Sequence, residues 1–124
     1  WMVLADVVNW PRWTPTVLQV DSLDSDQLAV GNRFRIHQPS LRPSVWKVVA
    51  VEPSISFRWE SRMPGLVMRA DHEIAPLPDN SSKVTLRFSF LGLLGFLAGA
   101  LNRKLVESYI AQEAAGLAKV FEKT

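Results

Sequence analysis

The chain has 124 residues, 48% of them hydrophobic and 21% charged, which predicts one globular domain over residues 1–124 and excludes a disordered chain. The formal net charge is +2 and the basic residues are scattered, so nucleic acid is not an expected partner. The absence of cysteine excludes disulfides, thiol catalysis and cysteine-ligated zinc, and it fits a cytoplasmic location.

Two short helices that meet at a sharp bend are predicted at the start of the chain. The apolar residues of segment 2–8 share one face at helical spacing, and Asn9 tolerates the backbone conformation that ends a helix. Pro11 suits the first turn of a second helix, where its missing N–H costs nothing. Trp10 and Trp13 are expected to wedge this bend against the end of the last helix.

The middle of the chain alternates apolar and polar residues with period two, which is typical of antiparallel strands with one buried face. The alternation is clearest in residues 31–38, 45–51, 55–61, 68–74 and 83–90. The Pro64-Gly65 pair and residues 78–82 are turn signals, so each strand reaches the next by a short hairpin. The parity places Ala50 and Ile55 on the buried face and Glu60, Glu73 and His37 on the solvent face.

A helix of about thirty residues is predicted after Phe90, because the period returns to 3.6. Its apolar stripe is expected to include Leu94, Leu97, Ala98, Leu101, Leu105, Tyr109, Leu117, Val120 and Phe121, and to lie across the apolar face of the sheet. Gly95 and Gly99 would let the helix approach the sheet closely. The apolar run 90–101 is shorter than the roughly 18 residues that span a bilayer, so stable membrane insertion is not expected.

Several of these segments resemble the polyketide cyclase/dehydrase branch of the START-like (SRPBCC, Bet v 1-like) superfamily. They are VLADVVNWPRWTPTV at 3–17, GNRFRI at 31–36, ADHEIAPL at 70–77, KVTLRF at 83–88 and EAAGLAKVFE at 113–122. The resemblance implies an α+β helix-grip fold: a curved antiparallel sheet wrapped around a long C-terminal helix, with two short N-terminal helices. About six strands are present, and the first strand of the family is expected to be missing upstream of Trp1.

A sheet that curls around one helix leaves space for a pocket, and the resemblance favours a cavity over a solid core built from the same side chains. The ligand-binding candidates, chosen by strand parity and helix spacing, are Trp13, Phe34, Ile36, Gln38, Trp46, Val48, Phe57, Trp59, Met68, His72, Leu86, Phe88, Leu97, Leu101, Leu105 and Tyr109. Gln38, His72 and Tyr109 would be the polar groups that orient a ligand.

His72 is the best candidate for a catalytic residue, because parity points it inward, where an imidazole could act as a general acid or base. The alternative is a histidine that is hydrogen-bonded in the core, or a ring at the edge of the sheet that lies under the helix. Two histidines on opposite faces and no cysteine do not make a metal site, and no cofactor is expected. No inward pair of carboxylates is predicted: Glu113 could lie near the pocket mouth, although an exposed glutamate is commoner.

These features predict binding of a small hydrophobic or amphipathic ligand, such as a lipid, a polyketide or an aromatic compound. The alternative is an enzyme that resembles polyketide cyclases, aromatases or dehydratases and uses the same cavity. A third hypothesis is a membrane-surface or partner-binding module that uses the apolar start of the long helix. The expected partner is a small hydrophobic molecule, and the expected state is a monomer or homodimer.

Overall fold

The computed structural model describes residues 1–39, 41–79 and 81–122, with the side chains of 96–98 and 121–122 left out of the description. The elements in chain order are the helix α1 (Met2–Ala5), the 3₁₀ helix η1 (Val7–Arg12), the strands β1 (Gln19–Ser22), β2 (Arg33–His37), β3 (Ser44–Glu52), β4 (Ser56–Met63), β5 (Leu66–Pro76) and β6 (Ser82–Leu91), and the helix α2 (Gly95–Glu122).

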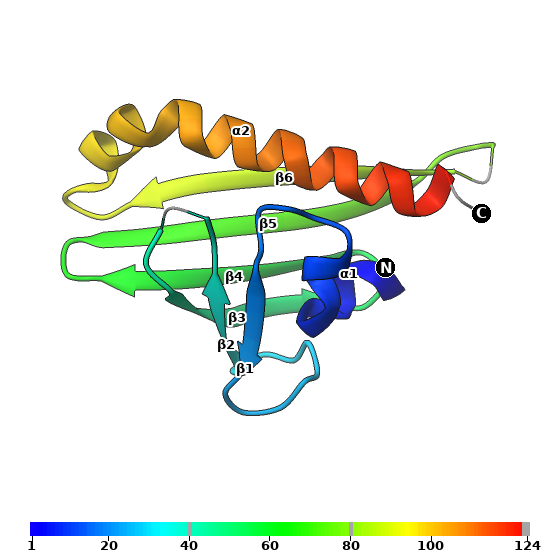
Figure 1. Ribbon diagram of the computed structural model, residues 1–124, viewed down its shortest axis with the longest axis horizontal. Helices are drawn as coiled ribbons and strands as arrows, with labels where there is room; N and C mark the ends of the chain where they lie inside the picture. The colour runs from blue at the N-terminus through cyan, green and yellow to red at the C-terminus, as the bar shows by residue number, and fades with distance from the viewer. Residues whose placement is uncertain (40, 80, 123–124) are drawn as a thin grey trace.

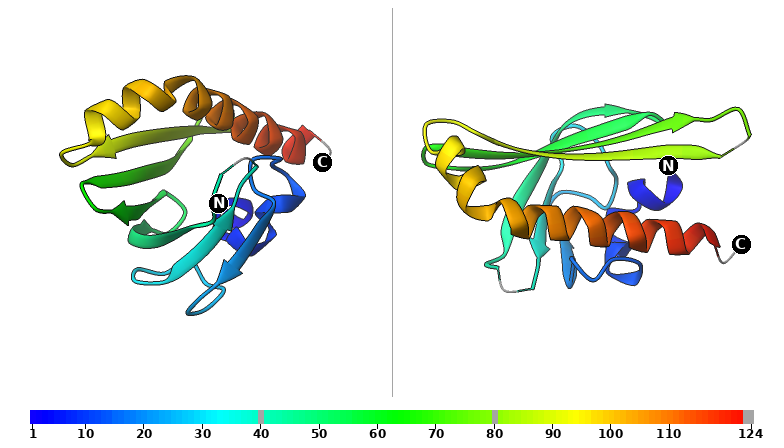
Figure 2. Two further views of the ribbon diagram at one scale, coloured as in Figure 1. Left: turned by 60° about the vertical axis from the view of Figure 1, so that its left-hand side comes forward. Right: turned by 90° about the horizontal axis from the view of Figure 1, so that it is seen from above.

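The six strands form one antiparallel sheet in the order β1-β2-β3-β4-β5-β6, which confirms the predicted meander. The sheet curves so that β1 and β2 stand far from β6 across a concave face (Figure 1, Figure 2). The hairpin between β4 and β5 turns at Pro64 and Gly65, and Gly65 has a φ of 74°, a conformation that favours glycine. The α+β helix-grip fold is thereby confirmed.

The helix α2 runs along β6, at one side of the sheet, rather than lying over the middle of the concave face (Figure 2). In the described part of the chain, its backbone approaches only β6 and β5 among the strands. A Cβ atom on Gly95 would lie 2.8 Å from the Phe90 carbonyl oxygen, so the predicted close approach at this glycine is confirmed. The rest of α2 overhangs the concave face and leaves room beneath it.

The predicted boundary between the two N-terminal helices is wrong. The helix α1 ends at Ala5, and Asn9 and Pro11 both lie inside η1. The cause is Trp10, whose buried indole N–H donates a 3.0 Å hydrogen bond to the Leu4 carbonyl. That carbonyl would accept the i+4 backbone N–H in a continuous helix, so the tryptophan side chain replaces the helical bond.

Two exposure predictions for the sheet are also wrong, and a third residue lies on its predicted face but is buried. The strand β3 has an irregular register between Val48 and Ala50, which turns Ala50 out of the buried face. Ile55 is 54% exposed because it lies in the turn before β4. Glu60 is on the solvent face but only 5% exposed, since it accepts hydrogen bonds from Arg62 and Arg69.

The predicted apolar stripe of the long helix is only partly buried. Leu94 precedes α2 and is exposed, and Leu101 is 75% exposed, whereas Leu117 is buried. The reason is that the α2 backbone approaches only β6 and β5 among the strands of the described chain, so part of the helix surface has no strand to cover it. None of the helices in the described residues has the length and hydropathy that crossing a membrane requires.

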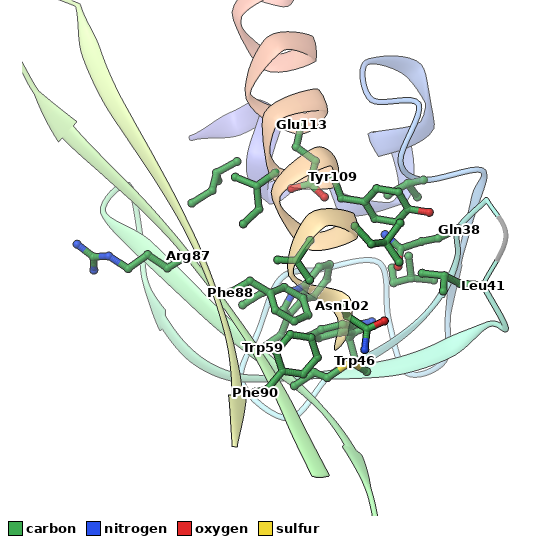
Figure 3. A pocket seen from close by; sticks show the side chains of 18 of the residues that line it. Gln38, Leu41, Trp46, Trp59, Arg87, Phe88, Phe90, Asn102, Tyr109 and Glu113 are labelled. Carbon is green, nitrogen blue, oxygen red and sulfur yellow. The ribbon is translucent and has the colours of Figure 1, made fainter. Parts of the chain in front are cut away.

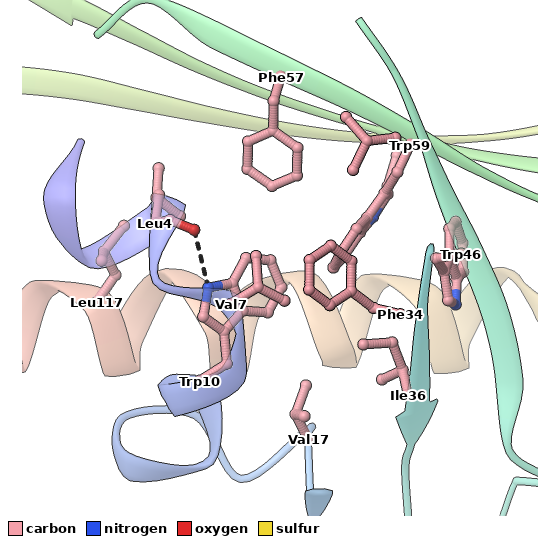
Figure 4. Close-up of a cluster of buried hydrophobic side chains, with 12 residues drawn as sticks. Leu4, Val7, Trp10, Val17, Phe34, Ile36, Trp46, Phe57, Trp59 and Leu117 are labelled. Carbon is pink, nitrogen blue, oxygen red and sulfur yellow. Dashed lines mark hydrogen bonds between the residues drawn. The ribbon is translucent and has the colours of Figure 1, made fainter. Parts of the chain in front are cut away.

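The hydrophobic core lies where the N-terminal segment fills one half of the concave face (Figure 4). Its largest fully buried side chains are Trp10, Phe34 and Phe57. The Trp10 ring lies 6.2 Å from Phe57 and 5.2 Å from Trp59, measured between ring centroids. The end of α2 joins this core through Leu117, and a Cβ on Gly116 would lie 2.0 Å from the Trp13 carbonyl oxygen. The segment that holds both tryptophans is therefore packed between the sheet and α2, as expected.

Candidate functional site

A cavity of about 230 Å³ lies between α2 and the part of the concave face that the N-terminal segment leaves open (Figure 3). The residues that line it come from the segment around η1, from β2 to β6 and from α2. They are Trp10, Val17, Ile36, Gln38, Leu41, Trp46, Trp59, Met63, Leu66, Met68, Ala70, His72, Leu86, Arg87, Phe88, Phe90, Asn102, Leu105, Val106, Tyr109, Ile110 and Glu113.

The deep wall of the cavity is aromatic. Trp46 and Trp59 are both buried, and their ring centroids are 5.7 Å apart. The Phe88 ring continues this wall at 5.9 Å from Trp46. Leu41 and Leu105 also line the cavity but are exposed to solvent, so they mark its opening. The cavity is thus an apolar pocket with one side open.

Ten of the ligand-binding residues in the sequence prediction line this pocket. They are Ile36, Gln38, Trp46, Trp59, Met68, His72, Leu86, Phe88, Leu105 and Tyr109. Their part in ligand binding stays a prediction, because geometry alone does not test it.

The other predicted residues do not line the pocket. Phe34, Val48 and Phe57 are on the concave face, but the N-terminal segment covers that half of it and makes them core residues. Trp13 packs on Trp10 with a centroid distance of 5.4 Å, and Leu101 points to solvent. The side chain of Leu97 lies outside the described residues. Parity identified the correct face of the sheet, but not which half of it the helix covers.

His72 lies in the pocket wall and is 4% exposed. Its ring stacks on Phe57 at a centroid distance of 4.2 Å and an interplanar angle of 5°. Burial lowers the pKa of His72 to about 3, against a small opposing effect of the Asp71 charge, so the imidazole is neutral at pH 7. Its Nδ1 atom is buried without a hydrogen-bond partner in the described residues.

Glu113 lines the pocket, whereas the sequence left open whether it lies near the pocket mouth or is exposed to solvent. Its carboxyl group lies at the same end of the pocket as Tyr109 (Figure 3) and accepts a 3.3 Å hydrogen bond from the Thr16 hydroxyl. Burial raises the pKa of Glu113 to about 7, while the Thr16 hydrogen bond lowers it by less. The sequence indicates this position, because Glu113 follows the predicted pocket residue Tyr109 by four residues and so shares its helix face.

Two further polar side chains of the pocket, those of Tyr109 and Arg87, have other partners. The Tyr109 hydroxyl donates a 2.6 Å hydrogen bond to the Pro39 carbonyl. The Arg87 side chain leaves the pocket (Figure 3) and pairs with Glu73 at 2.9 Å. Within the described chain, no three histidine or acidic side chains are grouped in a way that could hold a metal ion.

A second groove, of about 730 Å³, runs between α1, α2 and β6, the last strand in the sheet order. Trp1, Leu4, Val84 and Leu117 are among the residues that line it. The expectation that a further strand pairs with β6 upstream of Trp1 stays a prediction.

A family model described as "Polyketide cyclase / dehydrase and lipid transport" matches residues 1–122, almost the whole chain. A search of curated proteins gave no match.

Proposed function

The chain belongs to the polyketide cyclase/dehydrase and lipid transport family, and we propose that it binds a small hydrophobic or amphipathic molecule in the pocket beneath α2. One observation carries this proposal: the cavity of about 230 Å³ has an aromatic and aliphatic wall with only a few polar groups. That composition is usual for small-molecule sites. At roughly 30 Å³ per non-hydrogen atom, the cavity has room for about eight such atoms, and its open side accommodates one or two more.

Desolvation of the ligand would supply the affinity. An eight-carbon chain gains about 6 kcal/mol at about 0.8 kcal/mol per buried CH₂ group. Loss of translational and rotational freedom offsets part of this gain. We therefore expect dissociation constants weaker than about 40 μM for simple apolar compounds of this size, and near 1 mM if the offset is about 2 kcal/mol.

The proposal is tested by titration with naphthalene, a neutral aromatic compound of suitable size, followed through tryptophan emission. Trp10, Trp46 and Trp59 line the pocket, so bound naphthalene should change their fluorescence. The variant Ala70→Phe should fill the pocket and weaken binding at least tenfold, because Ala70 pairs with Trp59 and Phe88 in the sheet. Ala75→Phe is the matched control, since Ala75 is exposed on the same strand.

Saturable binding that Ala70→Phe weakens and Ala75→Phe does not would support the proposal. No saturable response in the unmodified protein would contradict it. Equal affinity in both variants would also contradict it, because the ligand would then lie elsewhere.

A second candidate function is proton-transfer catalysis on a ketone in the same pocket, as in cyclisation or dehydration of a polyketide. The observation that favours it is the position of Glu113 in the pocket with its pKa raised to about 7, since such a carboxyl group can take and return protons at neutral pH. His72 is the weaker base, because its lowered pKa of about 3 makes its imidazole a poor proton acceptor.

This second function is tested with octan-2-one in D₂O. A proton next to the carbonyl would move to the Glu113 carboxylate, the electron pair would shift to the carbonyl oxygen, and a deuteron would return to the same carbon. NMR should then show exchange that is faster than in buffer, is lost in Glu113→Gln and persists in His72→Phe. Loss in His72→Phe with retention in Glu113→Gln would overturn the assignment to Glu113, and exchange no faster than in buffer would overturn the catalytic function.

A further inference from the structure

Glu113 is an acidic residue in a pocket that is lined mainly by apolar side chains. The neighbouring pocket residues on the same helix face include Val106 and Ile110, and Val17 approaches from the segment after η1. One oxygen of the carboxyl group accepts the Thr16 hydroxyl at 3.3 Å, and Thr16 is itself buried and bonded to Thr14 at 2.8 Å. The threonine pair therefore fixes the Glu113 carboxyl at the boundary between α2 and the N-terminal segment.

Within the described residues, the Glu113 carboxyl group accepts a hydrogen bond from the Thr16 hydroxyl and forms no ion pair with a cationic side chain. The charged and titratable side chains that line the pocket with it are His72, Arg87 and Tyr109. His72 is neutral, the Arg87 guanidinium lies outside and pairs with Glu73, and the Tyr109 hydroxyl donates to Pro39. The interior thus holds an acidic group whose charge the surrounding residues do not neutralise.

We propose that Glu113 selects the ligand by binding the polar end of a small amphiphile that carries a hydrogen-bond donor, above all a primary amine. The apolar part of the same molecule then lies against Trp46, Trp59 and Phe88. This inference rests on the proposed binding function and names the chemical class of the ligand.

The negative charge of the Glu113 carboxylate favours an amine over a fatty acid as the ligand. An ammonium group would form an ion pair with the Glu113 carboxylate, and a buried ion pair of this kind removes the cost of an isolated buried charge. The Trp10 ring, which also lines the pocket, offers an aromatic face that attracts cations. A carboxylate ligand would instead place a second acid beside Glu113, and like charges in one site disfavour ionisation.

The test compares three ligands of equal chain length, octan-1-amine, octan-1-ol and octanoate, at pH 7.5 by calorimetry or tryptophan emission. The amine should bind at least tenfold more tightly than octanoate, with the alcohol between them. In Glu113→Gln the amine should lose at least fivefold in affinity and octanoate should gain. Glu107→Gln is the matched control, because Glu107 is on the same helix, is 64% exposed and pairs with Arg103.

A ranking of amine over alcohol over octanoate that Glu113→Gln removes and Glu107→Gln preserves supports the inference. Equal affinities for the three ligands, or tighter binding of octanoate, overturn it without any variant. If Glu113→Gln keeps the ranking, the selection does not depend on Glu113 and the inference is also overturned.

Naphthalene binding distinguishes a failure of the role of Glu113 from a failure of the proposed binding function. Binding of naphthalene without any ranking among the octyl compounds leaves the binding function intact and refutes the role of Glu113. Absence of binding by naphthalene and by all three octyl compounds refutes the binding function itself.

Discussion

His72 and Glu113 line the same pocket, and burial shifts their pKa values in opposite directions. Desolvation disfavours the charged form of each, so it lowers the pKa of His72 to about 3 and raises that of Glu113 to about 7. Between pH 5 and 8 the two shifts have opposite effects on stability. Lowering the pH favours the folded state through Glu113 and disfavours it through His72. The two contributions, roughly 2–3 kcal/mol each, should nearly cancel.

The variant Glu113→Gln should reveal the contribution of His72. An unfolded histidine binds a proton below its ordinary pKa of 6.5, whereas the folded His72 stays neutral until about pH 3. The free energy of unfolding of this variant should therefore fall by roughly 2 kcal/mol between pH 8 and pH 5. Urea denaturation at both pH values measures this change. The unmodified protein serves as reference, and an equally flat profile in both proteins would contradict the prediction.

The variant His72→Phe should show the opposite slope. An unfolded glutamate loses its proton above pH 4.5, whereas folded Glu113 holds its proton until about pH 7. The free energy of unfolding should thus rise by about 1–3 kcal/mol as the pH falls from 8 to 5. Phenylalanine keeps the stack on Phe57 and leaves no unpartnered Nδ1 atom. A decrease toward pH 5, measured by the same urea denaturation, would refute the assignment of this effect to Glu113.

At the scale of elements, the fold depends on the contacts that attach α2 to the rest of the chain. Besides its packing along β6, it is held by Thr16 to Glu113, by Tyr109 to Pro39 and by the close approach of Gly116 to Trp13. All three are contacts with segments that precede β3. The helix therefore connects β6, near the end of the chain, with the N-terminal segment, and the pocket lies between them.

The variant Gly116→Ala tests this attachment. The added Cβ atom would lie 2.0 Å from the Trp13 carbonyl oxygen, a backbone atom that cannot rotate away. We expect a loss of more than about 2 kcal/mol in the free energy of unfolding. Gly99→Ala on the same helix is the control, because its Cβ would meet Phe90 at an ordinary 3.4 Å. That control should be neutral or stabilise by up to about 1 kcal/mol; a similar loss in both variants would mean that the close approach is not the cause.

At the scale of the whole molecule, the sequence was sufficient for the sheet and its connections, because alternation and turn residues act locally. It was not sufficient where one side chain overrides a local pattern, as when the indole of Trp10 takes the Leu4 carbonyl and ends α1. The sequence also did not predict which residues are buried by a segment that is distant in the chain. Phe34 and Phe57 alternate like Trp46 and Trp59, yet the N-terminal segment covers the first pair and leaves the second pair facing the cavity.

Glu113 illustrates the same limit at the site. An isolated glutamate on a long helix is normally exposed. Glu113 is instead only partly exposed, and its hydrogen-bond partner Thr16 is 97 residues away in sequence, a contact that no local pattern contains. The sequence offered a position near the pocket mouth, but choosing it required knowledge of which face of α2 lies over the pocket.

Ligand binding should couple α2 to the strands β2, β3 and β4. The pocket wall contains residues of all four elements, although within the described residues the α2 backbone does not approach these three strands. A ligand would supply those missing contacts, so local opening of α2 should become less frequent than in the free protein. We expect saturating naphthalene to slow amide hydrogen exchange at least fivefold over residues 102–113, with a smaller effect in β4 and β5. Ala70→Phe should abolish the ligand effect, and Ala75→Phe should keep it. Equal slowing throughout the chain would indicate a general stabilisation, and no slowing over residues 102–113 would show that the ligand does not contact α2.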